Sequence, residues 1–566
     1  YKLIFRFSES WEKSGIYEDW SYCAHNRIPY TAMYGLNPFE RVGSVINITR
    51  GTKFEISKNY VHMYENYLLN GCEPLLYKGN MMSMVYGRGV DSTSATLEQS
   101  SCSTVIKYAL NLINYVNEED SISLKKLILR NYNANSQATI IETLSIPELM
   151  KLQEILTEDI EVEEYTGSKV FYHMDRVTHH KGSYAVGLAM MSSRISNYES
   201  INGANEKGWY LADGALYVYN ENDLNQFNGL FYTYSDPYKR PGTTVDTQER
   251  QAVNIRNGLE YKSDQDFVGG VTMEDEYVVA AMALESFHND VPGSTTTEGY
   301  GGAQPIHNCS LVAQKSWFMF DDEIVALGSA INANDGYDVL TVVENRKLAS
   351  DDYMETITFN DEVIGKAAAF EGSVELQKEG ISWVYLEGTG GYCFPQGGNL
   401  KYRLYDNFSK FFEMWLDHGV SPADQNYAYI LLPNKNREET KVYAANPNAE
   451  ILYNTAALQA VRENALGITG MVFWEAGQCN LKNAGEITVN CPLLMMAKET
   501  EAELLLSISD PTQKLETATI TINNQLLTLI DCDTEISIDT TNVGKKIMVD
   551  FTEASGKTIT VKFKTY

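Results

Sequence analysis

The spacing of hydrophobic residues changes near residue 165. Before this point, apolar residues recur at steps of three and four, as in Val105, Ala109, Leu112 and Val116 and again over 124–128 and 149–156. This period predicts amphipathic helices. The segment 157–164 then holds five acidic residues and no basic residue in eight positions, which favours a solvated connector.

The chain after residue 165 has the pattern of β-strands. The run 184–190 is rich in β-prone residues, and 517–522 and 557–563 alternate apolar with polar residues. Alternation of this kind is typical of antiparallel sheets with one solvated face. Turn-forming pairs also predict two hairpins. These hairpins join 316–320 to 323–327 through Asp321-Asp322, and 208–210 to 215–219 through Asp213-Gly214.

We therefore predict an α+β chain of several domains. The expected divisions are a helical part over residues 1–165, a central β part over 166–474 and a C-terminal β-domain over 475–566. A run of helices followed by runs of strands favours separate packed layers over alternating βαβ units.

The composition describes a globular protein. Hydrophobic residues make up 44% and charged residues 21% of the 566 residues, which excludes a disordered chain or a coiled coil. The formal charge of −30 argues against sequence-independent nucleic-acid binding, because phosphate groups need clustered Lys and Arg. Residues 1–130 hold 14 Lys plus Arg against 13 Asp plus Glu, whereas 131–566 hold 31 against 62. The excess of acidic residues thus lies after residue 130, mostly outside the helical part. An anionic partner is steered by the local potential rather than by the total charge.

The sequence lacks the common cofactor and metal motifs. It has neither GxxxxGK[ST] nor HExxH, and its eight cysteines form no CxxC pair, so we expect mostly free, buried thiols. His173, His179 and His180 lie close together, but neighbouring histidines on a strand point to opposite faces, so no shared metal is expected. The longest apolar runs, such as 324–327, are far shorter than the roughly 20 residues of a membrane span.

One aromatic stretch that ends in glycine, 19–35, carries candidate acid–base chemistry. Its His25 and Tyr34 stand nine positions apart. Taken alone, His25 would be a hydrogen-bonded structural histidine and Tyr34 a core residue; together they could form an acid–base pair. Further on, Arg88 stands between two glycines, which suits either a side chain directed into a cleft or an exposed turn.

These residues lie within motifs that resemble polysaccharide lyase family 8, the family of the hyaluronate, chondroitin AC and xanthan lyases. The motifs follow one another in the family's order over essentially the whole chain. They are His25 with Tyr34, 79–89 around Arg88, 192–202 with Glu199, 208–214, 236–244 and 315–318. The resemblance implies the C-terminal part of an incomplete α/α toroid, then an antiparallel β-supersandwich and a smaller C-terminal β-sandwich domain.

The resemblance also implies a reaction. Family members cleave a uronic-acid-containing polymer by β-elimination, without a required metal. Tyr34 would remove the C5 proton and then protonate the departing oxygen, while His25 would help to stabilise the charge that develops on the carboxylate. A phenol is a weak base at neutral pH, so Arg88 would favour its phenolate form. Glu199 would orient Arg88 or Tyr34 through charge-assisted hydrogen bonds.

Three further residues are assigned to substrate binding. Asn202 would reach the sugar by resemblance, and Trp20 and Tyr86 come from the two matched stretches of the helical part. Because Glu199 and Asn202 lie in the β part, the site is expected between domains, which is a common place for a ligand. Without the resemblance, Glu199 would be interpreted as half of an interdomain ion pair.

The sequence departs from the family pattern in two places. The family's carboxylate-neutralising asparagine lies well before the histidine, but only 24 residues precede His25. We therefore expect the second half of a toroid, with the first half either on a separate N-terminal chain or missing; Asn26 is a conceivable local substitute. Many members also carry an arginine four residues after the site arginine, where this chain has Ser92.

The leading hypothesis is thus a lyase acting on an acidic polysaccharide of the hyaluronan, chondroitin or xanthan class. The alternative is a non-catalytic carbohydrate-binding or scaffold fragment of a lyase-like protein. A glycoside hydrolase would need paired carboxylates, and Glu199 has no acidic partner in the matched motifs. We expect no required cofactor and allow for a structural calcium ion. We expect a secreted or cell-surface protein of bacterial type.

Overall fold

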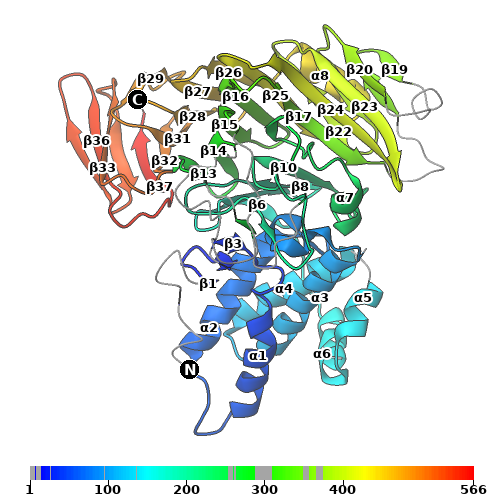
Figure 1. The fold of residues 1–566 in the computed structure, drawn as a ribbon. Helices are drawn as coiled ribbons and strands as arrows, with labels where there is room; N and C mark the ends of the chain where they lie inside the picture. The colour runs from blue at the N-terminus through cyan, green and yellow to red at the C-terminus, as the bar shows by residue number, and fades with distance from the viewer. Residues whose placement is uncertain are drawn as a thin grey trace, which may run out of the picture.

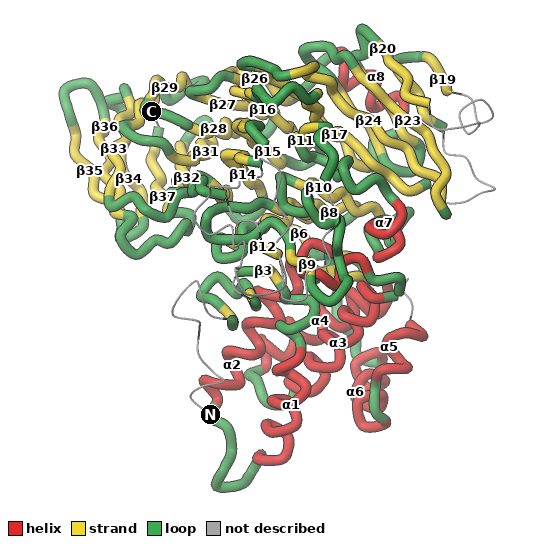
Figure 2. The backbone as a smooth tube through the Cα atoms, viewed as in Figure 1, coloured by secondary structure: helices red, strands yellow, loops and turns green. Residues whose placement is uncertain are grey.

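The computed structural model describes residues 7, 14–25, 27–94, 96–134, 137–250, 252, 259–260, 263–286, 309–348, 356–364 and 374–565. Within these ranges, α-helices dominate up to residue 156 and strands dominate afterwards. The helices form one body and the strands form stacked sheets beside it (Figure 1, Figure 2). The predicted α+β class is therefore confirmed, and the acidic segment 157–164 is the connector between the two parts.

The helical part is organised around a central helix, α3, which packs against α1, α4, α5 and α6. The buried residues of α3, such as Cys102, Val105, Ile106 and Ala109, follow the predicted steps of three and four. α6 starts at a capping box formed by Ser145 and Glu148. The helices are α1 (Asn37–Thr49), α2 (Lys58–Asn66), α3 (Leu97–Leu112), α4 (Glu118–Ala134), α5 (Gln137–Thr143) and α6 (Ile146–Leu156).

An irregular segment joins α2 to α3 and carries Arg88. Pro74 interrupts the helical run that begins in α2, because it has no N–H to continue the hydrogen-bond ladder. The segment then crosses the top of the helical part in short turns. Its elements are η1 (Tyr67–Cys72), η2 (Glu73–Leu75), β4 (Leu76–Tyr77), β5 (Asn80–Met81), η3 (Ser83–Val85) and η4 (Gly87–Asp91).

Three larger antiparallel sheets make up most of the central part that the structure describes. A four-stranded sheet contains β10 (Ala215–Asn220), β8 (Tyr184–Ala189), β7 (Arg176–Lys181) and β6 (Thr166–Phe171). A nine-stranded sheet contains, in order, β13 (Val268–Met273), β14 (Tyr277–Glu285), β15 (Val312–Met319), β16 (Ile324–Asn332), β25 (Gln425–Pro433), β22 (Gly390–Cys393), β21 (Trp383–Leu386), β18 (Ile357–Phe359) and β19 (Glu362–Ile364). A five-stranded sheet contains β11 (Thr244–Asp246), β17 (Asp338–Lys347), β24 (Ser409–Val420), β23 (Leu400–Asn407) and β20 (Val374–Lys378). Two short helices, α7 (Gly229–Tyr234) and α8 (Arg437–Ala445), accompany these sheets.

Two further sheets form the C-terminal sandwich. The first contains β26 (Ala449–Asn454), β27 (Leu458–Glu463), β28 (Ile468–Phe473), β31 (Leu493–Glu499), β32 (Glu503–Ser509), β37 (Ile559–Lys564) and β34 (Thr528–Cys532). The second contains β29 (Gly477–Asn480), β30 (Glu486–Val489), β33 (Thr517–Ile522), β36 (Lys545–Asp550) and β35 (Ile536–Thr540). The predicted strands at 517–522 and 557–563 correspond to β33 and β37.

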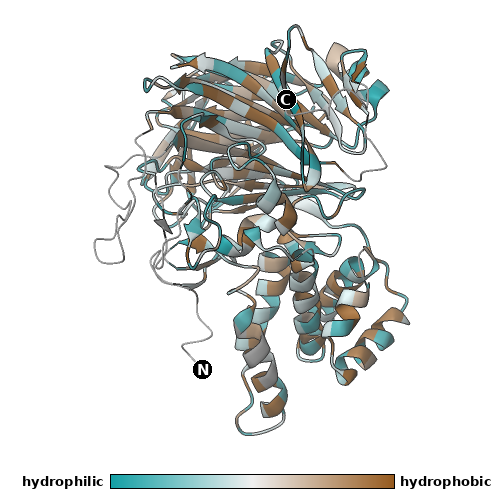
Figure 3. Ribbon diagram, turned by 45° about the vertical axis from the view of Figure 1, so that its right-hand side comes forward, coloured by the Kyte–Doolittle hydropathy of each residue, from teal (hydrophilic) through white to brown (hydrophobic). Residues whose placement is uncertain are grey.

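The seven-stranded sheet has an apolar core on each face. Figure 3 shows hydrophobic residues in bands along the strands of the β part. Neighbouring residues alternate between the faces, as the two-residue period of a strand requires. Val461, Val472 and Met496 pack toward the nine-stranded sheet, and Ala460, Met471 and Met495 pack into the core of the C-terminal sandwich. This sheet therefore joins the central part to the C-terminal sandwich.

Of the strand predictions, one hairpin is confirmed, while a second hairpin and one domain boundary differ from the observed strands. The hairpin through Asp321-Asp322 is confirmed by the pairing of β15 with β16, but the hairpin through Asp213-Gly214 is wrong. Residues 208–214 form no strand, and β10 pairs with β8 instead. Residues 449–474, assigned from the sequence to the central part, form β26–β28, and β28 pairs with β31 of the C-terminal part.

The cysteines and histidines lie as expected. All eight cysteines are free thiols, six of them buried. His179 and His180 point to opposite sides of β7: His179 Nε2 lies 2.7 Å from the Phe320 carbonyl, and His180 Nε2 lies 2.8 Å from the Pro74 carbonyl. No α-helix in the described ranges is long and apolar enough to cross a bilayer.

Glu98, in the first turn of α3, provides a test of stability against pH. Its side chain is buried, and burial raises its pKa to about 7, although its own backbone N–H and Lys347 oppose the shift. The native state therefore holds a proton that the unfolded chain releases between about pH 4.5 and 7, so this group lowers stability as pH rises through that window. We expect Glu98→Gln to raise the free energy of unfolding by about 1–3 kcal/mol at pH 8 and to leave it unchanged at pH 4.

Denaturant unfolding of both proteins at the two pH values measures this difference. Glu142→Gln, at an exposed position of α5, is the control and should have little effect at either pH. An equal change at pH 4 and pH 8 for Glu98→Gln would show that the charge of the carboxylate is not the cause.

Candidate functional site

The short strands near the start of the chain lie where the helical part meets the β-sheets (Figure 1). Three short strands, β1 (Gly15–Ile16), β2 (Tyr22–Ala24) and β3 (Ile28–Pro29), form a small sheet there. His25 lies in the turn between β2 and β3 and has a left-handed backbone, with φ of 47°. Arg27 in the same turn donates through Nη1 to the Ser193 carbonyl at 2.7 Å. This bond fixes the turn that carries His25 to the β part.

The four predicted catalytic residues form one connected cluster. His25 Nδ1 lies 2.6 Å from Glu199 Oε1, and Arg88 donates through Nη1 to Glu199 Oε2 at 3.0 Å. Arg88 also donates through Nη2 to the Tyr34 hydroxyl at 3.1 Å. The rings of His25 and Tyr34 lie with their centroids 4.8 Å apart. One guanidinium group thus connects the phenol to the carboxylate.

Close packing explains why both residues beside Arg88 are glycine. Gly87 has a left-handed backbone, and a Cβ atom there would lie 2.0 Å from the ring of Tyr30. A Cβ atom on Gly89 would lie 2.4 Å from Met33 Sδ. Only glycine lets the backbone approach these side chains so closely. The Arg88 side chain is partly buried and directed toward Tyr34 and Glu199.

Glu199 comes from the β part, in β9 (Glu199–Ser200), which pairs with β12 (Leu259–Glu260). Its side chain is 3% exposed. Asn205 donates through Nδ2 to the Glu199 carbonyl at 2.9 Å, and its backbone N–H donates to Asp91 of η4 at 2.6 Å. The interdomain ion pair considered from the sequence is present, and it joins Glu199 to Arg88.

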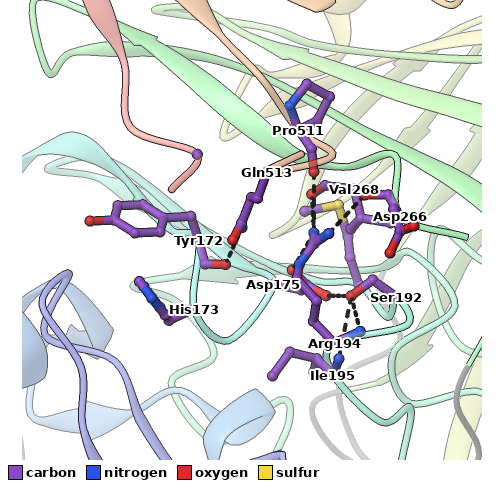
Figure 4. A network of polar contacts seen from close by, with 12 residues as sticks. Tyr172, His173, Asp175, Ser192, Arg194, Ile195, Asp266, Val268, Pro511 and Gln513 are labelled. Atoms are coloured by element: carbon purple, nitrogen blue, oxygen red, sulfur yellow. Dashed lines mark hydrogen bonds and ion pairs between the residues drawn. The ribbon is translucent and has the colours of Figure 1, made fainter. Parts of the chain in front are cut away.

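The segment before Glu199 is anchored by the buried side chain of Arg194 (Figure 4). Arg194 donates to the carbonyls of Val268 at 2.7 Å and Asp266 at 2.9 Å, and to those of Pro511 and Thr512 at 3.2 Å. Its Nη2 also lies 3.4 Å from Asp175 Oδ1. One guanidinium group therefore connects 192–197 to the central sheet and to the loop after β32.

Tyr30 is a member of the cluster that the sequence did not indicate. Its hydroxyl donates to Glu199 Oε2 and accepts from the backbone N–H of Arg88 at 3.0 Å. The side chain is completely buried. The only sequence signal was its place in the aromatic stretch, four residues before Tyr34, and that stretch also contains Tyr22.

The other predicted residues lie outside this set of contacts. Asn202 is exposed in the turn after β9, and Trp20 is half-buried against the ring of Phe7. Tyr86 differs from the expectation of a substrate contact, because its side chain is completely buried and its hydroxyl donates to the Leu97 carbonyl at 3.3 Å. Asn26 lies outside the described residues, and Ser92 is half-buried in the loop after η4.

The cluster has the groups for proton transfer at a charged substrate. A cation beside a phenol favours the phenolate form, and His25 can donate to or accept from a ligand. Among the described residues, two sets of side chains could share a metal ion: His62 with Glu65 and Asp120, and Asp246 with Cys309 and Asp335. Neither set includes a residue of the cluster.

Comparison with known proteins agrees with this organisation. Three models of polysaccharide lyase family 8 match consecutive parts of the chain. They are the N-terminal alpha-helical domain over residues 4–130, the super-sandwich domain over 166–444 and the C-terminal beta-sandwich domain over 450–519.

Relatives and solved structures extend the comparison. A xanthan lyase of Bacillus sp. is 31% identical over 88% of this chain and 53% of its own length. The hyaluronate lyase HylB of Enterococcus faecalis is 28% identical over 96% of this chain and 54% of its own length. The structure of a Paenibacillus xanthan lyase covers the whole chain with a TM-score of 0.87 at 30% identity, using 53% of its own chain. A chondroitin AC lyase of Streptomyces coelicolor A3 shares the fold, with a TM-score of 0.81, 24% identity and coverage of 100% and 73%. The chain spans about half the length of the first two relatives.

Proposed function

This chain belongs to polysaccharide lyase family 8, and from that we propose that it forms part of an enzyme that cleaves a uronic-acid-containing polysaccharide by β-elimination. The observation that supports the proposal is the series of contacts from His25 through Glu199 and Arg88 to Tyr34. The substrate class follows from relatives named as lyases of xanthan, hyaluronate and chondroitin. As such polymers are extracellular, we also propose a secreted or cell-surface protein.

In the proposed reaction, Tyr34 acts as base and then as acid. Its phenolate oxygen takes the proton from C5 of the uronate, the electron pair forms a C4–C5 double bond, and the C4–O bond breaks. Tyr34 then gives the same proton to the departing oxygen. No water is consumed, and the products are an unsaturated uronide and a new hydroxyl group. Arg88 donates to the Tyr34 hydroxyl at 3.1 Å, and this contact fixes the position of the oxygen that begins the cycle.

The uronate carboxylate needs help to carry the charge that develops as C5 loses its proton. His25 is the described side chain placed to supply it, because Glu199 holds its Nδ1 at 2.6 Å and the ring is 39% exposed. The second, amide-bearing group expected from the family was not found among the described residues of the cluster. In the proposal this group comes from outside the described residues, either from Asn26 or from an N-terminal chain that completes the toroid.

A scaffold that binds polysaccharide without cleaving it is the alternative. It would keep the β-sheets but would have no need for a cation bridging a phenol and a buried carboxylate, so the Arg88 contacts favour the lyase. Hydrolysis fits less well, because no described carboxylate other than Glu199 contacts His25, Tyr34 or Arg88.

The test incubates the protein, in the form in which the cell produces it, with hyaluronan, chondroitin sulfate and xanthan. We expect the ultraviolet absorbance of an unsaturated uronide to rise with at least one polymer, and to rise equally in the presence of a chelator. New reducing ends without that absorbance would indicate hydrolysis, and binding without cleavage would favour the scaffold.

A further inference from the structure

Tyr30 connects the two halves of the candidate site through one buried hydroxyl group. The hydroxyl donates its proton to Glu199 Oε2. It accepts from the backbone N–H of Arg88 at 3.0 Å and lies 3.3 Å from Arg88 Nη1. A phenol has one proton to donate and two lone pairs, so these three contacts use its full capacity.

The ring of Tyr30 is fixed as firmly as its hydroxyl. It is completely buried and lies so close to Gly87 that no Cβ atom fits there. It also packs edge-on against Tyr34, with ring centroids 4.8 Å apart, and against His25, with centroids 5.5 Å apart. Burial and the charge of Glu199 raise its pKa well above that of an ordinary tyrosine, so Tyr30 stays a neutral donor throughout the working pH range.

The hydrogen bonds between Glu199 and Arg88 determine how much of the Arg88 guanidinium is available to Tyr34. Glu199 Oε2 accepts from both Tyr30 and Arg88 Nη1, while Arg88 Nη2 is left for Tyr34. Without the Tyr30 hydroxyl, that oxygen would depend on Arg88 alone, and the Arg88 backbone would lose its acceptor. The guanidinium would then be drawn toward Glu199, so its Nη2 contact with the Tyr34 hydroxyl would weaken.

We propose that Tyr30 is a positioning residue of the lyase site, which shares the charge of Glu199 and holds Arg88 where it can act on Tyr34. This inference rests on the proposed function, and it adds a residue that never touches the substrate. Its action passes through Glu199 and Arg88, so it should affect the chemical step and its pH dependence more than substrate binding.

Tyr30→Phe keeps the ring and removes only the hydroxyl. We expect kcat to fall about 10- to 100-fold, as for a displacement of catalytic groups by a fraction of an ångström to one ångström, with KM within about threefold. The ascending limb of the pH profile of kcat/KM should move up by about one pH unit, because a hydrogen bond to a charged group is lost. The readout is the initial rate of ultraviolet absorbance at several pH values.

Tyr77→Phe is the matched control, because the Tyr77 hydroxyl is also buried in the helical part and has no hydrogen-bond partner among the described residues. It should leave kcat and the pH profile unchanged. In a Glu199→Gln background, Tyr30→Phe should have a much smaller effect than in the wild type, since the two residues act as a unit.

The outcomes separate the two proposals. An active wild type whose Tyr30→Phe variant keeps its kcat and pH profile would overturn the role of Tyr30 alone. The same would follow if the variant lost only thermal stability, or if its effect were unchanged in the Glu199→Gln background. A wild type that forms no unsaturated product would overturn the proposed function, and the role of Tyr30 with it.

Discussion

Tyr34→Phe is expected to reduce kcat by about 10²- to 10⁴-fold, the range that a positioned acid–base group contributes. Phenylalanine keeps the ring contacts of Tyr34 with His25 and Tyr30 but removes the oxygen that accepts from Arg88. No proton can then move between this side chain and the sugar. Because the remaining contacts are kept, KM and binding of the intact polymer should change only a few-fold.

The control for this variant is Tyr22→Phe. Tyr22 lies in β2, is partly buried, and packs in the same small apolar cluster as Tyr34, but it does not contact Arg88 in the structure. It should stay close to wild-type activity. The rate is followed by ultraviolet absorbance of the unsaturated product, and binding is measured separately by calorimetry with undigested polymer. A Tyr34→Phe variant that retained full activity would disprove the assignment of Tyr34 as the base.

The sequence was sufficient to propose the cluster because its members lie in recognisable local motifs. His25 and Tyr34 are nine residues apart, and Arg88 stands between two glycines. The spatial link to Glu199, 174 residues after His25, came from the order of the motifs and could not be obtained from residue spacing. The contact itself depends on how the helical part meets the sheets.

Tyr30 and Tyr86 show where local sequence is uninformative. The chain has 37 tyrosines, and the residue type suits a sugar surface, a core or a hydrogen-bond network equally well. Tyr86 packs in the core and Tyr30 bonds to Glu199. Burial decides between these roles, and it is set by elements distant in sequence.

The strands show the same division between local and distant information. Alternation located β33 and β37 closely, because each strand has its own two-residue period. It could not show that β26–β28 belong to the same sheet as the C-terminal strands, since either grouping satisfies the same pattern. The false hairpin at 208–219 failed because Trp209 and Tyr210 are held in turns by the side chains of Asn197 and Arg250.

Arg194→Met is expected to lower the free energy of unfolding by about 3–5 kcal/mol, the cost of removing one partner from a buried ion pair. Methionine fills similar space but cannot donate to the four carbonyls that Arg194 reaches. The substitution also leaves Asp175, which is 1% exposed, without its ion-pair partner Arg194. Burial already raises the pKa of Asp175 and Arg194 opposes that shift, so losing the guanidinium leaves this carboxylate less compensated. Differential scanning calorimetry and denaturant unfolding measure the loss.

Two variants test whether Arg194 acts through this network. Arg462→Met, at a half-buried arginine of β27 that donates to the Asn480 carbonyl, should cost no more than about 1 kcal/mol. Adding Asp175→Asn to Arg194→Met removes the uncompensated charge and should recover part of the lost stability. Arg194 lies five residues before Glu199 and bonds to the loop after β32 (Figure 4). Loss of this bond frees the loop, so protease cleavage near 510–513 should also increase. An Arg194→Met variant as stable as the wild type would show that the carbonyl contacts add nothing beyond what water supplies.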